Sequence, residues 1–203
     1  MLKKTILITA TAVSAFALHT AQININDRDL EIGAKFDIGQ FNDKVEPDTM
    51  FIGGRFLNGQ KENSQLETGG SPTSLDPYYE LSFLMKRPMG DMGMSFGMGV
   101  KLNYTSLGTK NFSSLPLGLE FEYVIPAKKL VPMYLSGSLY FAPSALSFND
   151  AKDFLEYRIS YDIELIKNGR VTVGYRNINT NYDTVSGKVV YNNSYYVGFK
   201  FAF

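Results

Sequence analysis

Apolar and polar residues alternate with a period of two along most of this chain. Between residues 94 and 104, Met, Phe, Val, Leu and Tyr occupy every second position, and polar or small residues fill the positions between them. The stretch FLEYRISYDIELIK (154–167) repeats the pattern with charged or hydroxylic residues. An α-helix repeats about every 3.6 residues, so this period indicates β-strands. The pattern predicts nine strands, at residues 30–39, 50–57, 78–86, 94–104, 117–125, 133–141, 154–167, 170–177 and 191–203.

The connections between these strands alternate in length from residue 58 onward. The short ones cover residues 87–93, 126–132 and 167–169, and the long ones cover residues 58–77, 106–116, 143–153 and 179–188. Outer-membrane barrels have this asymmetry, with short periplasmic turns and longer extracellular loops. If the last strand ends in the periplasm, every short turn falls there and every long loop falls outside.

The apolar faces are too large for the inside of a small barrel. Together they hold about forty large side chains, whereas the interior of an eight-stranded barrel takes roughly a dozen. The apolar set must therefore point outward, and in water it would form a patch far above the few hundred Å² that a monomer tolerates. The sequence thus predicts an all-β fold, an antiparallel transmembrane β-barrel with its polar face inside. The competing structure is a β-sandwich, which would hide about half of the apolar set between two sheets.

The number of strands lies between eight and ten. Eight strands from Met50 onward already close an even barrel, and residues 29–39 add a ninth. Bacterial outer-membrane barrels have an even number of strands. Either LHTAQININ (18–26) therefore supplies a further strand, which gives ten, or the segment before Glu46 lies outside the barrel wall. We prefer ten.

The first residues read as a secretory signal peptide. Lys3 and Lys4 precede an apolar run from Ile6 to about Phe16, and Ala15-Phe16-Ala17 supplies a cleavage site of small residues. The run is about a dozen residues long, whereas a membrane-spanning helix needs about 20. We assign the signal peptide to 1–17, with 1–21 as the alternative, and a single barrel domain to 18–203.

Composition narrows the possible partners. Cleavage removes two of the 20 Lys and Arg and none of the 20 Asp and Glu, so the net charge of the mature chain is about −2 and no nucleic-acid partner is indicated. The absence of cysteine excludes disulfides, thiolate metal sites and a lipid-modified N-terminal cysteine. Membrane attachment must then come from the fold itself.

Candidate chemistry is sparse. The single histidine, His19, lies in or just after the signal peptide, so Ser-His-Asp triads and His-ligated zinc are not expected in the barrel. We therefore expect no enzyme, catalytic residue, metal or cofactor. The polar face instead carries charged residues of both signs, and in a narrow interior these must meet. They are Lys35, Asp37, Arg55, Glu80, Lys86, Lys101, Glu120, Glu122, Glu156, Arg158, Asp162, Glu164, Arg170, Arg176 and Lys200. An ion-paired filling that holds the barrel rigid is the main interpretation, and a narrow pore or a pair of catalytic carboxylates are the alternatives.

The chain ends in the strand SYYVGFKFAF, with apolar residues at alternate positions counted back from the last one. These are Tyr195, Val197, Phe199, Phe201 and Phe203, and the pattern resembles the C-terminal signal that the insertion machinery of bacterial outer-membrane barrels reads. Tyrosines near the strand ends are expected to form interfacial girdles, at Tyr79, Tyr104, Tyr123, Tyr175 and Tyr195.

Residues 134–203 also carry a family resemblance. Within LYFAPSALSFNDAKDFLEYRISYDIELIKNGRVTVGYRNINTNY (139–182), the Tyr-Phe-Ala-Pro after a strand, the Leu-Glu-Tyr-Arg strand and the Val-Gly-Tyr-Arg-Asn-Ile strand, together with the closing YYVGFKFAF, are similar to the YfaZ family of outer-membrane proteins. The resemblance implies a small barrel of the Gram-negative outer membrane, and it brings no catalytic residues.

The sequence thus predicts a small outer-membrane barrel with a largely plugged, charged lumen and a structural or surface-interaction role. The alternatives are a narrow ion or small-solute channel and a periplasmic β-sandwich binding protein. The expected partners are outer-membrane lipid and lipopolysaccharide, and, during biogenesis, the secretory translocon, periplasmic chaperones and the barrel-insertion machinery.

Overall fold

The computed structural model of the chain describes residues 19–59, 65–66, 76–90, 93–107, 109–126, 131–183 and 188–203. The predicted signal peptide at 1–17 lies outside these residues, whereas the alternative boundary at Ala21 falls inside the first strand. No helix within the described ranges has the length and apolar character needed to cross a bilayer.

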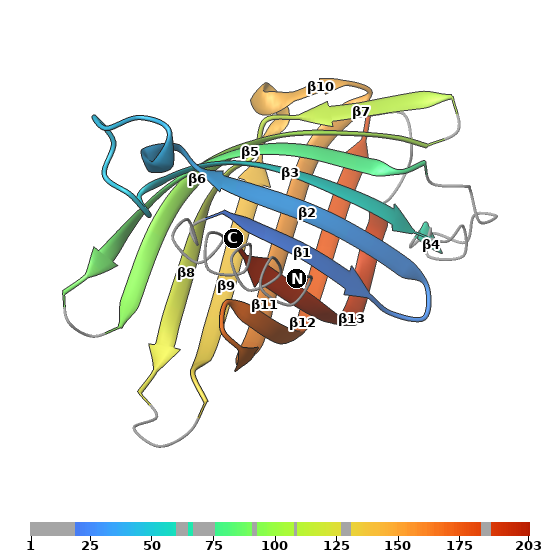
Figure 1. The fold of residues 1–203 in the computed structure, drawn as a ribbon. Coiled ribbons are helices and arrows are strands. Elements are labelled where there is room, and N and C mark those ends of the chain that lie inside the picture. The colour runs from blue at the N-terminus through green and yellow to red at the C-terminus, as the bar shows by residue number, and fades with distance from the viewer. Residues whose placement is uncertain are drawn as a thin grey trace, which may run out of the picture.

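Within the described residues, ten antiparallel strands form one closed ring, in which each strand pairs with the one before and the one after it and the last pairs with the first (Figure 1). The ring confirms the predicted barrel and the preferred count of ten, and it excludes the competing β-sandwich, which has no such closure. The strands are β1 (Thr20–Ile25), β2 (Asp29–Asp37), β3 (Met50–Gly59), β5 (Tyr78–Met89), β6 (Met94–Leu107), β8 (Leu117–Ile125), β9 (Met133–Ala142), β11 (Ala151–Ile166), β12 (Gly169–Tyr182) and β13 (Lys188–Ala202).

The tenth strand comes from the segment LHTAQININ. All six residues of β1 pair with β13, from Thr20 opposite Ala202 to Ile25 opposite Val197. Just beyond this register, the backbone N–H of His19 donates to the carbonyl of Phe203 at 3.1 Å, and the N–H of Phe203 donates back at 2.8 Å. The two ends of the barrel wall therefore meet in one continuous ladder, which leaves no open sheet edge there.

Three short strands lie where the sequence predicted long loops. These are β4 (Gln65–Leu66), β7 (Lys110–Ser114) and β10 (Ser147–Asn149), with the 3-10 turn η3 (Ser144–Leu146) before β10. Prolines separate β7 from β8 at Pro116 and β9 from β10 at Pro143. Beyond each break the backbone still needs partners, so β7 pairs with the far end of β6 and β10 pairs with β7.

The barrel has two different ends. At what we call the short-turn end, β5 is followed by β6, β8 by β9, and β11 by β12; at the long-loop end, β3 is followed by β5, β9 by β11, and β12 by β13. Two early connections depart from the predicted asymmetry. Residues 26–28 make a tight turn at the long-loop end, and residues 38–49, which contain the 3-10 turn η1 (Ile38–Gln40), make a longer connection at the short-turn end.

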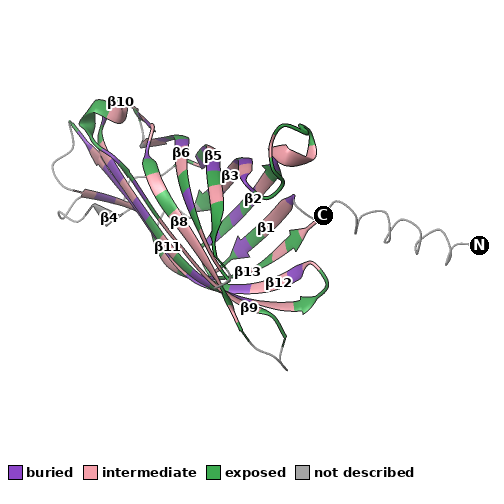
Figure 2. Cartoon of the chain, turned by 90° about the vertical axis from the view of Figure 1, so that its left-hand side faces the viewer, coloured by how far each residue is buried: buried purple, intermediate pink, exposed green. Residues whose placement is uncertain are grey.

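The two faces of the wall differ in chemistry as the alternation predicts. Buried and exposed residues alternate along the strands (Figure 2). Met98 is 64% exposed and Ile159 is 49% exposed on the outer face, whereas Lys101 and Ser160 on the inner face are 5% and 8% exposed. Thirty-two large apolar side chains are exposed among the described residues. A polar interior inside an apolar wall is the arrangement of a membrane barrel.

Candidate functional site

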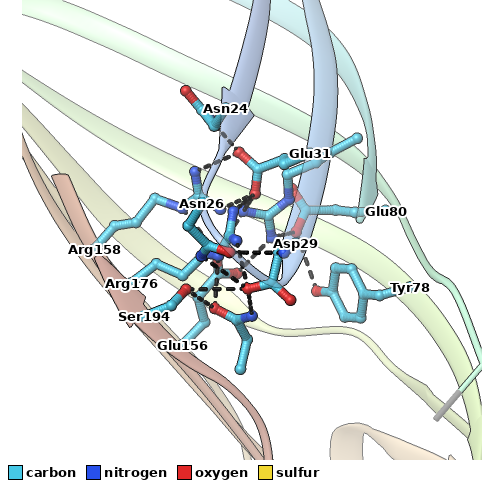
Figure 3. Close-up of polar contacts among 12 residues, drawn as sticks. Asn24, Asn26, Asp29, Glu31, Tyr78, Glu80, Glu156, Arg158, Arg176 and Ser194 are labelled. Carbon is cyan, nitrogen blue, oxygen red and sulfur yellow. Dashed lines mark hydrogen bonds and ion pairs between the residues drawn. The ribbon is translucent and has the colours of Figure 1, made fainter. Parts of the chain in front are cut away.

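The centre of the barrel holds a balanced cluster of ionised side chains, which we call the central charge network (Figure 3). Its side chains are at most 14% exposed, and they come from β2, β3, β5, β6, β11 and β12, so residues distant in sequence meet only because the sheet closes. The four acids are Asp29, Glu31, Glu80 and Glu156, and the four bases are Arg55, Lys101, Arg158 and Arg176.

Glu31 on β2 receives the largest share of the contacts. Arg158 donates to both of its carboxylate oxygens, at 2.9 and 2.6 Å, and Arg176 donates to Oε2 at 2.7 Å. The Asn24 amide donates to Oε1 at 2.6 Å, and Nη1 of Arg55 lies 3.8 Å from Oε2. Because Glu31 is fully buried, these donors replace the water that its charge has lost.

A second centre of the network forms around Glu156 on β11. Arg55 holds both of its oxygens, at 2.7 and 2.9 Å, and Nζ of Lys101 donates to Oε2 at 2.9 Å. Arg55 also donates to Glu80, which lies 3.3 Å from Nζ of Lys101. Two acids and two bases thus share one buried space, an arrangement in which the charges compensate one another.

The network continues to the tight turn between β1 and β2. Arg176 lies 3.3 Å from Oδ2 of Asp29, and Nε of Arg176 donates to Asn192 at 2.7 Å. The side chains of Asn192 and Ser194 also donate to Asp29, at 2.5 and 3.2 Å. Asn26 fixes the turn itself, because its side-chain oxygen accepts from the backbone N–H of Asp29 at 2.6 Å.

An apolar layer covers the network on the side of the long-loop end. Its rings pack on one another, with Phe112 6.0 Å from Phe154 and 5.6 Å from Tyr182 between ring centroids. Tyr78 joins the layer to the network, since its hydroxyl donates to Glu80 at 3.1 Å. The layer consists of Leu57, Tyr78, Phe112, Ala142, Ala151, Phe154, Ile178, Tyr182, Val189 and Tyr191, all at most 5% exposed.

On the opposite side of the network lies a cavity of about 390 Å³, which we call the chamber. It reaches the short-turn end, where residues such as Asn168 and Ala202 line it. Ion pairs also occur at this level. They are Lys35 with Glu120 at 2.9 Å, Lys86 with Glu122 at 3.2 Å, Lys200 with Asp162 at 2.7 Å, and Arg170 with Glu122 at 3.6 Å and with Glu164 at 3.9 Å.

The predicted charges therefore fall into two groups in the structure. Lys101, Glu156, Arg158 and Arg176 lie in the central charge network, together with Arg55 and Glu80. The chamber level contains Lys35, Lys86, Glu120, Glu122, Asp162, Glu164, Arg170 and Lys200. Asp37 belongs to neither group, because its carboxylate accepts from the backbone N–H groups of Gly39 and Asp48 at the start of the 38–49 connection.

The sequence reasoning missed two acids of the network, Asp29 and Glu31. The signal that could have found them is parity, since both lie an even number of positions before Lys35 on the same strand and so share its inner face. Nothing in the sequence distinguished Glu31 from its neighbours, because its three arginine partners come from β3, β11 and β12.

The residues of the predicted C-terminal signal line the outer face of β13. Tyr195 is 77% exposed, Val197 is 54% exposed, and Phe199 and Phe201 are each 37% exposed. Phe203 lies beyond the strand, with its ring 5.8 Å from that of His19. Among the predicted girdle residues, Tyr79 lies opposite Tyr104 and Tyr175 opposite Tyr195 in adjacent strands, whereas Tyr123 lies near the short-turn end of β8. Their roles in insertion and at the interface stay predictions.

The single histidine lies immediately before β1. Its Nδ1 accepts from the backbone N–H of Asp37 at 3.1 Å, and its ring stacks on Phe41 at 5.1 Å between centroids. Within the described ranges no group of three or more histidine or acidic residues is placed to hold a metal ion. The absence of an enzymatic role stays a prediction.

The comparisons with solved structures give several matches. One is the "KdgM porin", with 9% identity and a TM-score of 0.44 over 91% of this chain and 98% of that chain. Another is a structure titled "Unveiling the Mechanism Behind the in-meso Crystallization of Membrane Proteins", with 8% identity and a TM-score of 0.38 over 91% of this chain and 83% of that chain. No curated protein matches the chain. The family model described as "YfaZ precursor" matches residues 78–203, more than half of the sequence, and the chain therefore belongs to the YfaZ family.

Proposed function

We propose that this protein is a small β-barrel of a Gram-negative outer membrane, that its lumen is largely plugged, and that its role is structural or surface-interactive, without catalysis. The observation that supports the plug is the pair of layers stacked in the interior. The apolar layer and the central charge network follow each other along the barrel axis, and no network side chain exceeds 14% exposure. Ions would have to break buried ion pairs and displace packed rings to pass.

The outer face supports the proposed location. An aqueous environment would leave the exposed apolar side chains in contact with water, whereas acyl chains match them. The partners we propose are outer-membrane lipid and lipopolysaccharide. The partners we propose during biogenesis are the secretory translocon, periplasmic chaperones and the barrel-insertion machinery. The insertion machinery would read the row of outward apolar side chains that ends at Phe203.

Planar-bilayer recording of the refolded barrel tests the plug. We expect no conductance steps from the wild-type protein in a bilayer where a channel-forming porin, added as a control, conducts. Reproducible steps from the wild-type barrel would refute the plugged lumen. Heat-modifiable gel mobility in an outer-membrane fraction tests the location, and recovery of the mature protein as a detergent-free periplasmic species would refute it.

The second candidate is a narrow channel, and the chamber is the observation that favours it. A cavity with ion pairs along its wall could be the wide part of a pore that the central network narrows. This candidate predicts conductance that increases when the constriction is weakened, for example by Arg55→Ala together with Glu156→Ala. Absent conductance in both proteins would count against it, because the apolar layer would then keep the path closed.

A further inference from the structure

The chamber owes its space to small residues that flank Glu122 in one row on the inner face of the wall. In the registers of β6, β8, β9, β11 and β12, Ser95 lies opposite Glu122, Glu122 opposite Ser136, Ser136 opposite Ser160, and Ser160 opposite Gly174. Large residues at these positions would fill the barrel at this level, as Arg158 and Arg176 do in the next row toward the long-loop end. The row therefore leaves room for a guest of moderate size.

The hydroxyl groups around the chamber have unused hydrogen-bonding capacity. Five serines line it, and none of their side chains forms a hydrogen bond to any residue in the described part of the chain. Each of these hydroxyl oxygens also keeps some exposed surface and is therefore open to the cavity. The five are Ser82, Ser95, Ser136, Ser138 and Ser160.

The charges inside the chamber are, in contrast, already paired, and Asp48, a lining acid without an ion pair in the described part of the chain, is exposed to solvent. Lys35, Lys86 and Lys200 each have a carboxylate oxygen within 3.2 Å. Arg170 lies between Glu122 and Glu164, and its guanidinium stacks on the Tyr134 ring at 3.5 Å from the centroid. A guest with a net charge would have to separate one of these pairs or remain unpaired itself, and both cost free energy in a confined space.

We propose that the chamber is a binding site for a small, uncharged, polyhydroxylated solute of monosaccharide to disaccharide size, entering from the short-turn end. Its volume of about 390 Å³ falls near the lower end of the range of about 300–1,000 Å³ typical of small-molecule sites. Hydroxyl groups both donate and accept, so such a solute can bond to the free serines and to the remaining lone pairs of Glu120 and Glu122 without breaking an ion pair.

Three sugars of similar size that differ in charge test this inference. Isothermal titration calorimetry of the refolded, full-length mature barrel in detergent micelles would compare glucose, glucuronate and glucosamine, with maltose as the larger neutral probe. We expect the neutral sugars to bind and the two charged ones to bind at least about tenfold more weakly, because each brings an uncompensated charge. No binding of either neutral sugar would mean that the chamber holds only water, and glucuronate or glucosamine binding as tightly as glucose would contradict the charge argument. Either result overturns the proposal.

Serine variants test whether binding occurs in the chamber. Ser136→Ala combined with Ser160→Ala removes two hydroxyls and keeps the space, so we expect glucose affinity to fall by about tenfold. Ser160→Phe should abolish binding by filling the space. Ser144→Ala, an exposed serine on η3 at the long-loop end, is the matched control and should bind glucose like the wild type. Unchanged affinity in the double variant, with heat-modifiable mobility intact, would place the sugar elsewhere and overturn the proposal.

This inference goes beyond the plugged barrel proposed above, and the two fail separately. A dead-end chamber binds solute without conducting, so conductance steps refute the plug and say nothing against binding. Absence of sugar binding leaves the plug untouched.

Discussion

Replacing Glu31 with glutamine should strongly destabilise the barrel. The substitution keeps the size and shape of the side chain but removes its charge and one of its acceptor oxygens. The central charge network contains four acids and four bases, so Glu31→Gln leaves one buried positive charge without compensation. Arg158 and Arg176 lose their shortest charged contacts, at 2.6 and 2.7 Å.

The expected loss is about 3–5 kcal/mol in the free energy of unfolding, the cost of removing one partner from a buried ion pair. The matched control is Glu46→Gln. Glu46 pairs with Arg87 at 3.0 Å, close to the distances in the network, but both side chains are about 70% exposed. Water already solvates that pair, so its loss should cost less than about 1 kcal/mol.

Urea unfolding of barrels refolded into phospholipid vesicles would measure both variants. Tyrosine fluorescence and heat-modifiable gel mobility can report the transition, since the chain has no tryptophan. The comparison requires the same slope of free energy against urea in each protein. Glu31→Gln combined with Arg158→Met restores the balance of charges and should recover part of the loss. Equal destabilisation by Glu31→Gln and Glu46→Gln would refute the view that Glu31 is a desolvated charge held by its arginines.

Three further predictions concern the wall. Ile159→Arg should lower the free energy of unfolding in vesicles by about 2–4 kcal/mol if the side chain lies at the bilayer midplane, whereas Ser160→Arg on the inner face should lower it less. Equal losses in urea unfolding would contradict the assigned faces. Gly118→Val should lower stability by about 1–3 kcal/mol, because a Cβ there would lie 2.3 Å from the carbonyl oxygen of Leu139, and a wild-type unfolding midpoint would refute this. Deleting Phe203 should reduce the amount of folded barrel in the outer-membrane fraction, and wild-type levels would argue against its role in insertion.

The local alternation of apolar and polar residues was sufficient to predict most strands of the barrel wall. Strict alternation over residues 94–104 and 154–167 determined strand type and face, because side chains in a strand point to opposite sides in turn. The same rule predicted that Lys101 and Glu156 would lie inside, and the structure places both there at 5% exposure or less. The need for an even number of strands led to a count of ten, with residues 18–26 supplying the added strand.

The end of strict alternation was a poor guide to where the strands stop. The sequence predicted long loops at 106–116 and 143–153, and Pro116 and Pro143 do break the ladder locally. The structure nevertheless contains β7 and β10, because the far end of β6 presents backbone groups that β7 can pair with, and β7 in turn presents groups that β10 can pair with. Whether a segment next to a proline pairs depends on what lies beside it in space.

The sequence by itself determined that this chain alternates into strands, that its apolar face is too large to be enclosed, and that charged residues fill the other face. Those properties follow from composition and the two-residue period, which need no knowledge of neighbours. Only the tertiary structure decided which charges meet. Glu31 and Arg158 are 127 positions apart, and their contact exists because closing the ring of ten strands brings β2 and β11 face to face across the interior. The order of apolar layer, charge network and chamber has the same cause, since it depends on how each strand is shifted against the next.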